Sequence, residues 1–164
     1  MKENIINFLK ELKLTNELIT FIISMLPIVE LRGSIPIAIL KFKMPVLKSF
    51  LISVIGNLVP VLPIIYFLEP IRKFLSRIII FKKFFDWLYE RVYRKSEKNI
   101  QKYGAIGLAI FVAIPLPGTG AWTGSIAAIL FNIKTKYSFP AITVGVIIAG
   151  IIVSIIVKGL TIWH

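Results

Sequence analysis

The sequence of 164 residues contains no cysteine and a single histidine, His164. Disulfide bonds, zinc sites of the cysteine–histidine type, thiol catalysis and histidine-based catalytic triads are therefore excluded. No pair of catalytic groups is visible elsewhere in the chain, so the sequence does not predict an enzyme. We expect no metal ion and no cofactor.

Charged residues are also scarce, at 17% of the chain, whereas hydrophobic residues make up 57%. Soluble domains carry about 25% charged and 45–50% apolar residues. Because the apolar residues stand in long blocks, a soluble enzyme and a disordered chain are both excluded. Acidic residues are fewer than basic ones, 8 against 20, which gives a net charge of +12. This excess favours membrane lipids as partners, and without a recognisable binding motif we expect no nucleic acid.

The length allows one membrane domain, residues 1–164. Its first 17 residues lack the apolar core and small-residue cleavage site of a signal peptide. Apolar residues recur there at roughly helical spacing, with lysine and glutamate between them. This pattern predicts an amphipathic helix, which either lies on the membrane surface or is a solvated terminal helix.

Four hydrophobic blocks follow, and two of them are interrupted. Residues 49–68 and 138–157 are runs of 20 uncharged residues, and each is long enough for one membrane crossing. A kink is expected in the first of these runs, because it contains Gly56, Asn57, Pro60 and Pro63. The interrupted blocks are residues 18–40 and 103–133.

The block at residues 103–133 is too long for one ordinary span and contains the run PLPGTG at residues 115–120. That run cannot continue a helix, and it separates two arms, 103–114 and 121–133, each about half a bilayer long. A re-entrant hairpin is therefore predicted. The same reasoning gives the block at 18–40 a first arm at 18–26, a turn at 27–34 and a second arm beginning near Pro36. Two irregular spans, or one 23-residue helix, are the alternatives there.

An internal repeat supports the hairpins. The tripeptide GSI at residues 33–35 recurs at 124–126, and Lys43 and Lys134 share the same offset of 91 residues. One hairpin and one span make an odd number of crossings, so the second copy must be inverted. We therefore expect an all-α integral membrane fold with two inverted-topology repeats, residues 18–68 and 103–162. Each repeat would be a re-entrant helical hairpin followed by a transmembrane helix.

Residues 70–102 join the repeats and are strongly basic. Apolar residues at helical spacing alternate with lysine and arginine, which predicts an amphipathic connector helix on the lipid headgroups. A soluble connector that packs on the protein is the alternative. Twelve lysines and arginines on this side against seven on the other favour a cytoplasmic connector, and the reverse orientation stays open.

Glu30 and Arg32 are the only ionisable side chains within the apolar blocks. Such residues are functional candidates by default. Glu30 could take up a proton, since burial favours the protonated form of a carboxylate, and Arg32 could bind a phosphate or carboxylate. Alternatively, the two charges neutralise each other and fix the turn.

The second arms of both hairpins would begin near the bilayer midplane, where their backbone N–H groups and positive dipole ends favour an anion. We therefore expect a substrate site between the two hairpin tips. Its candidate residues are Glu30, Arg32, Gly33, Ser34, Pro117, Gly118, Thr119, Gly120, Trp122 and Thr123.

Other small and polar residues in the blocks are interpreted as packing devices. Small residues spaced by four allow helices to approach closely, and isolated polar residues in spans bond between helices. The small residues are Gly120, Gly124 and Ala128, and then Ala141, Gly145 and Ala149; the polar ones are Asn57 and Thr143.

The segments LPIVELRGSIP at 26–36 and PLPGTGAWTGS at 115–125 together resemble the small multidrug export protein family of prokaryotes. That family is similar to the DedA/VTT membrane proteins. The second resemblance implies two re-entrant hairpins and movement of lipids such as polyprenyl phosphates, with proton coupling. The family name implies efflux of amphipathic compounds.

These observations predict a small transporter in the prokaryotic cell membrane. It would move a phosphate-bearing lipid of the polyprenyl-phosphate or phospholipid type, and coupling to protons through Glu30 stays open. Because four blocks offer few walls for a site, we expect a homodimer. Efflux of cationic amphipathic compounds and a non-transporting membrane scaffold are the alternatives.

Overall fold

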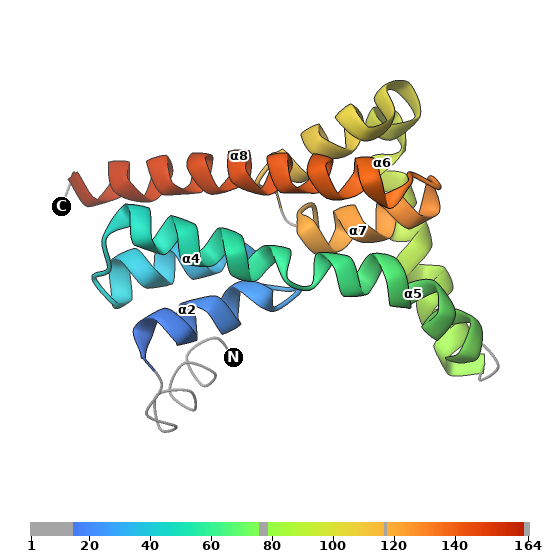
Figure 1. Cartoon of the computed structure of the whole chain (residues 1–164), viewed down its shortest axis with the longest axis horizontal. Coiled ribbons are helices and arrows are strands. Elements are labelled where there is room, and N and C mark those ends of the chain that lie inside the picture. The colour runs from blue at the N-terminus through green and yellow to red at the C-terminus, as the bar shows by residue number, and fades with distance from the viewer. Residues whose placement is uncertain (1–14, 76–78, 117, 163–164) are drawn as a thin grey trace. The chain divides into compact units, whose positions relative to one another are not determined.

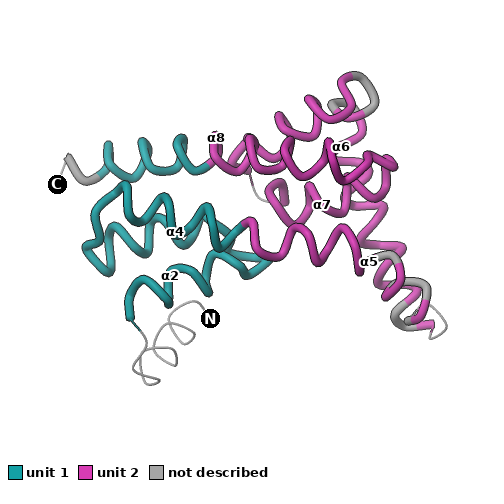
Figure 2. Tube along the Cα trace, viewed as in Figure 1, with its two compact units in different colours: residues 1–57, 150–164 teal, residues 58–149 magenta. Residues whose placement is uncertain are grey.

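A computed structural model of the protein describes residues 15–75, 79–116 and 118–162. In this part of the chain every regular element is a helix (Figure 1). The chain divides into two compact units, residues 1–57 with 150–164 and residues 58–149 (Figure 2). We call them unit 1 and unit 2 and describe each by itself. The predicted N-terminal helix lies outside the described residues up to residue 14.

Unit 1 begins with a short helical hairpin. Helix α2, Asn16–Met25, is capped by Thr15, whose hydroxyl accepts a hydrogen bond from the backbone N–H of Leu18. It ends at Met25, because the next residue, Leu26, precedes Pro27 and a residue before proline is disfavoured in the helical conformation. Helix α3, Glu30–Pro36, follows a short turn and packs against α2. Two short helices therefore lie where the sequence predicts the arms of a hairpin.

The turn of this hairpin is shorter than predicted. The sequence places the turn at residues 27–34, whereas α3 already begins at Glu30. Gly33 does not break the helix, because its backbone N–H donates to the carbonyl of Val29 at 3.0 Å. Pro36 is the last residue of α3, and the chain continues as the π-helix η1, Ile37–Lys41. Proline lacks an N–H group, and a change in helical winding beside it is an ordinary accommodation.

Helix α4, Val46–Leu58, returns alongside α3 and η1 after a loop of four residues, so the two run antiparallel (Figure 1). Two glycines fix close packing within unit 1. A Cβ atom on Gly56 would stand 2.7 Å from the carbonyl oxygen of Phe21 in α2. One on Gly150 would stand 2.7 Å from the ring of Phe50 in α4. Gly150 belongs to helix α8, Thr135–Ile162, whose C-terminal part completes unit 1.

Unit 2 contains the basic connector. Helix α5, Val61–Leu75, follows a turn at residues 59–60, which confirms the expected kink. Helix α6, Ile79–Ala113, is interrupted at Gly104, whose φ of 55° and ψ of −124° are not helical. The described part of the connector predicted at residues 70–102 is thus helical. The prediction of a single helix is wrong, because residues 70–75 belong to α5 and residues 79–102 belong to α6. Residues 76–78 lie outside the described chain.

The second hairpin lies in unit 2, close to its predicted bounds. After the break at Gly104, α6 ends at Ala113, and helix α7, Ala121–Leu130, packs against it. A Cβ atom on Gly124 would stand 2.5 Å from the side chain of Val112, and one on Gly145 would stand 2.7 Å from the same residue. The packing interpretation of these two small residues is confirmed.

Among the residues that the structure describes, two helical stretches are long and apolar enough to cross a membrane, Val46–Leu68 and Thr135–Leu160, of 23 and 26 residues. Only 39% and 44% of their apolar windows are buried inside the protein, whereas the core helix of a soluble protein is mostly buried. In α4 the exposed face carries Leu47, Leu51 and Ile55, while Ser49 and Ser53 are buried. An apolar outside and a polar inside are features of a membrane protein.

Both repeats predicted from the sequence show the same order of elements: a short helix, a turn, a second short helix, a loop and a long apolar helix. The hairpins are therefore observed as helical hairpins. Their re-entrant position in a bilayer and the inverted relation of the repeats stay predictions.

Candidate functional site

The interior of unit 1 is lined by polar side chains. They come from both hairpin helices, from α4 and from the end of α8, and most are fully buried. Burial of a polar group costs free energy unless the group is hydrogen-bonded, so each one calls for an explanation. The described members are Thr20, Ser24, Glu30, Ser34, Ser49, Ser53, Asn57 and Ser154.

The hydroxyls of Thr20, Ser24 and Ser49 donate to carbonyl oxygens three or four residues earlier in the chain. Thr20 donates to the carbonyl of Asn16 at 2.7 Å, and Ser49 donates to that of Pro45 at 3.0 Å. The hydroxyl of Ser154 has no hydrogen-bond partner among the described residues, whereas the hydroxyl of Ser34 in α3 donates to the hydroxyl of Ser53 in α4 at 2.7 Å. This bond ties the second hairpin helix to the first long apolar helix and fixes their register.

Glu30 is 4% exposed and is the first residue of α3. Its φ of 48° lies in the left-handed region, which is unusual for a residue with a long side chain and costs about 1–3 kcal/mol. The backbone N–H groups of Val29 and Glu30 both donate to the carbonyl of Leu26. The N–H groups that the sequence assigned to anion binding, near residues 34–36, lie inside α3 and not at its start, because the helix already begins at Glu30.

Arg32 lies two residues further along α3 and is half-buried. Its guanidinium is close enough to the carboxylate of Glu30 for the two charges to attract each other. Gly33 is also half-buried, and Ser34 is fully buried. The structure therefore brings four predicted site residues together on one short helix. It is consistent with both hypotheses for the charged pair, substrate binding and mutual neutralisation.

Asn57 of α4 lies at the same height along the two helices as Glu30 of α3. Because α3 and α4 run antiparallel, one helical turn from the Ser34–Ser53 bond toward the hairpin tip leads to Glu30 on α3 and to Asn57 on α4. Asn57 is completely buried, and its amide nitrogen and oxygen have no hydrogen-bond partner among the described residues. The predicted interhelical bond of Asn57 is therefore wrong within this part of the chain.

Thr143, the other polar residue assigned to interhelical bonding, donates to the carbonyl of Phe139 in its own helix at 2.9 Å. The interhelical interpretation is wrong for this residue too, because a threonine hydroxyl inside a helix can bond to the carbonyl four residues earlier.

The remaining predicted site residues belong to the second hairpin, in unit 2. Gly118 and Gly120 have φ values of 80° and 121°, which favour glycine and shape the turn before α7. The hydroxyl of Thr119 lies 2.6 Å from the carbonyl of Ile114 and 2.8 Å from that of Leu116, so it is used within the loop. Trp122 and Thr123 are half-buried, and Pro117 lies outside the described residues. That both hairpins form one site stays a prediction.

Sequence reasoning missed Ser53 and assigned Asn57 a structural role. A signal was available, because Ser49, Ser53 and Asn57 are spaced by four in an uncharged run and therefore share one helix face. In a membrane helix such a polar stripe predicts a face turned toward protein or water.

Comparison with known proteins relates the chain to a protein family. The sequence model of a family described as "Putative small multi-drug export protein" matches residues 30–152. The matched range begins at Glu30, the first residue of α3, includes the turn of the second hairpin and ends in α8. No curated protein and no solved structure matches the chain.

Proposed function

This chain belongs to the small multi-drug export family, and we propose that it is an integral membrane transporter whose first hairpin binds the charged group of an amphipathic substrate. The family is one of export proteins, a transport function that needs no catalytic group.

One observation carries it: the buried polar layer at the tip of the first hairpin. Glu30, Arg32 and Asn57 lie at this level, and Ser34 and Ser53 lie one turn away. In a membrane protein, buried ionisable and amide groups mark the path of a substrate or proton, because each costs free energy there. The strained backbone at Glu30 adds support, since such strain persists mainly at functional sites.

We propose a phosphate-bearing lipid as the substrate. A guanidinium can donate two parallel hydrogen bonds to a phosphate, which gives Arg32 the leading role. Asn57 can add one donor and one acceptor, both unused among the described residues. Glu30 would then neutralise Arg32 while the site is empty and take up a proton when the phosphate arrives.

Efflux of cationic amphipathic compounds is the second candidate. It is favoured by the burial of Glu30, because a buried carboxylate attracts a cation strongly. The family description fits this function as well as it fits lipid transport. In this case Glu30 binds the substrate and Arg32 only balances its charge.

Further parts of the proposal concern the setting of the site. The hairpins would enter the membrane without crossing it, the repeats would be inverted, and α6 would lie on the cytoplasmic surface. The prokaryotic cell membrane, a homodimer and a distant relationship to the DedA/VTT proteins belong to the same proposal. They rest on the two motifs and on the charge pattern of the sequence.

The experiment is reconstitution of the full chain in liposomes, with labelled polyprenyl phosphate, labelled phospholipid and a cationic dye followed in parallel. The variants are Arg32→Gln, Glu30→Gln and Asn57→Leu. Lys43→Gln is the matched control, because Lys43 is an exposed cation in the loop after the same hairpin. Loss of a charged hydrogen-bond partner costs about 1.5–3 kcal/mol, so Arg32→Gln should weaken phosphate-lipid binding about tenfold or more.

The three hypotheses give different outcomes. For a phosphate lipid, Arg32→Gln and Asn57→Leu abolish its movement, Glu30→Gln alters only its pH dependence, and Lys43→Gln changes nothing. For drug efflux, Glu30→Gln abolishes dye movement and Arg32→Gln does not. If no compound moves and the variants differ only in stability, the transporter proposal is wrong and a scaffold role is favoured.

A further inference from the structure

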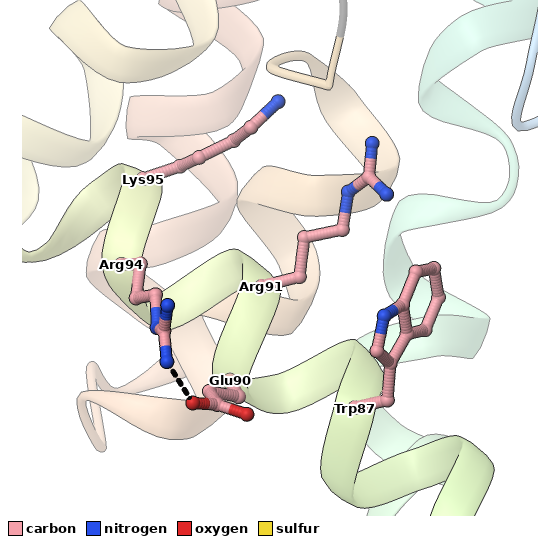
Figure 3. A pocket seen from close by; sticks show the side chains of 5 residues that line it. All are labelled: Trp87, Glu90, Arg91, Arg94 and Lys95. Atoms are coloured by element: carbon pink, nitrogen blue, oxygen red, sulfur yellow. Dashed lines mark hydrogen bonds and ion pairs between the residues drawn. The ribbon is translucent and has the colours of Figure 1, made fainter.

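A hollow on helix α6 of unit 2 is formed by side chains that the proposed function does not use. It has a volume of about 360 Å³ and is lined by Trp87, Glu90, Arg91, Arg94 and Lys95 (Figure 3). All five residues lie between the start of α6 and its break at Gly104. A concave surface with cations and one aromatic ring is typical of a site for a small anionic group.

The spacing of the residues explains the shape of the hollow. Trp87, Arg91 and Lys95 are spaced by four, so they share one face of α6. The central guanidinium carbon of Arg91 lies 5.2 Å from the centroid of the Trp87 ring, a cation–π arrangement. Figure 3 shows the long side chains of Arg91 and Lys95 extending from α6 toward the same side. The ring and the two cations therefore form three neighbouring parts of one surface.

The single carboxylate of the hollow does not oppose an anion. Glu90 forms an ion pair with Arg94, one helical turn away, and Figure 3 shows this pair on the flank of the hollow. The positive charge of Arg94 thus balances the negative charge of Glu90. With Arg91 and Lys95 in addition to this pair, the lining carries more positive than negative charge.

Lys95 also reaches the turn of the second hairpin. Its ammonium nitrogen is the atom that a Cβ on Gly118 would meet first. Because Gly118 has no side chain, the ammonium can lie directly against the backbone of this turn. The position of Lys95 is therefore fixed from two sides, by α6 and by the hairpin turn, and the lining is more than a row of solvated lysines.

We propose that this hollow binds a phosphate ester, and specifically the headgroup of an anionic lipid. The planar guanidinium of Arg91 matches two phosphate oxygens, and the ammonium of Lys95 supplies a second positive charge. A lipid is favoured over a soluble phosphate because α6 also exposes the large apolar side chains of Ile79, Phe84 and Trp87. Tryptophan beside basic residues is characteristic of the membrane–water interface. This site does not depend on the transport proposed above, but its lipid ligand rests on the proposed position of α6 at the membrane surface.

The test uses the full chain in a nonionic detergent and counts bound molecules by native mass spectrometry. The ligands are short-chain phosphatidylglycerol, glycerol phosphate as the soluble phosphate ester, and laurate as an anionic lipid without phosphate. The double variant Arg91→Gln with Lys95→Gln is compared with Lys82→Gln and Lys83→Gln, which remove two exposed charges from the same helix outside the hollow. Thermal unfolding verifies that both variants remain folded.

We expect the hollow variant to bind phosphatidylglycerol at least about tenfold more weakly than the control variant does. An equal loss in the two variants would show diffuse electrostatic attraction to α6 and overturn the proposal. Laurate binding as tight as that of phosphatidylglycerol would overturn the phosphate class. Glycerol phosphate binding that is as tight, and is lost in the hollow variant, would support the phosphate site and make a soluble ester its ligand. None of these results depends on whether substrate moves in liposomes.

Discussion

Replacement of Ser34 by alanine should destabilise unit 1, because it leaves the buried hydroxyl of Ser53 without its partner. Ser34 and Ser53 are both fully buried and joined by a hydrogen bond of 2.7 Å. Without Ser34, the hydroxyl of Ser53 loses the one side-chain hydrogen bond described for it. A buried polar group without a partner costs about 1–3 kcal/mol, and we expect a loss of this size in the free energy of unfolding.

The double variant Ser34→Ala with Ser53→Ala gives the decisive comparison. It removes both polar groups, so no hydroxyl remains to be buried without a partner, and such a replacement is close to neutral. The double variant should therefore be more stable than the sum of the single variants predicts, with a coupling of about 1 kcal/mol or more. The measurement is reversible unfolding in detergent micelles, followed by circular dichroism or steric trapping.

Ser154→Ala is the matched control in the same unit. The hydroxyl of Ser154 is buried and has no hydrogen-bond partner among the described residues, so its removal should be neutral or stabilising. Additive effects of the Ser34 and Ser53 substitutions would refute the reasoning. So would a single Ser34→Ala variant as stable as the native protein, because the two hydroxyls would then not share a buried bond.

Three further predictions concern other parts of the fold. Gly145→Ala should cost about 1–3 kcal/mol of unfolding free energy, because its Cβ would stand 2.7 Å from a backbone oxygen of α6; Gly159→Ala, with open space around it, should be neutral or stabilising by about 0.5–1 kcal/mol. Gly104→Ala should destabilise the break in α6 by about 1 kcal/mol or more, since φ of 55° with ψ of −124° suits only glycine; an unchanged melting temperature would contradict this. The hydrogen bond from Lys48 lowers the pKa of Glu17 below its usual 4.5, so this exposed pair should stabilise the protein above that pH and lose its effect as the pH falls through the lowered pKa. A Glu17→Gln variant with the native acid-unfolding profile would argue against it.

The second hairpin could be predicted from the sequence almost to the residue. Proline and glycine between residues 115 and 120 stop a helix by local chemistry, whatever lies around them. The predicted arms, 103–114 and 121–133, therefore agree closely with the helices that end at Ala113 and begin at Ala121. The sequence also separates the connector from the first arm between residues 102 and 103, close to the break at Gly104; the positive φ of that glycine was not predicted, because a single glycine inside a helical pattern does not by itself reveal it.

The first hairpin was harder to predict, because its helix continues through Gly33 and Pro36, where packing compensates for their low helix propensity. Gly33 and Pro36 both suggest a long turn, but α3 packs against α2 and keeps its backbone hydrogen bonds through Gly33. The proline is accommodated by the change to a π-helix, which sequence patterns do not signal. Local propensity is a weak prior wherever packing can repay its cost.

The members of the candidate site on α3 were predicted, whereas those on α4 were missed. Glu30 and Arg32 stand out in any apolar block, since their burial is costly wherever it occurs. The spacing of Ser49, Ser53 and Asn57 indicates one shared face of α4, but the structure was needed to show that this face is buried and contacts Ser34. The hollow at Trp87, Arg91 and Lys95 required the path of the second hairpin turn as well as the helical spacing.

The central claim, that the polar tip of the first hairpin lies within the membrane, can be tested with one labelled residue. The chain has no cysteine, so a spin label on Ile28→Cys is unique, and Ile28 is 85% exposed in the turn between α2 and α3. Accessibility to oxygen and to a polar relaxation agent gives the depth of the label in liposomes. We predict a label at mid-depth, well below a reference label on Lys48→Cys. A label at position 28 found at the headgroup level, like the reference, would contradict the account.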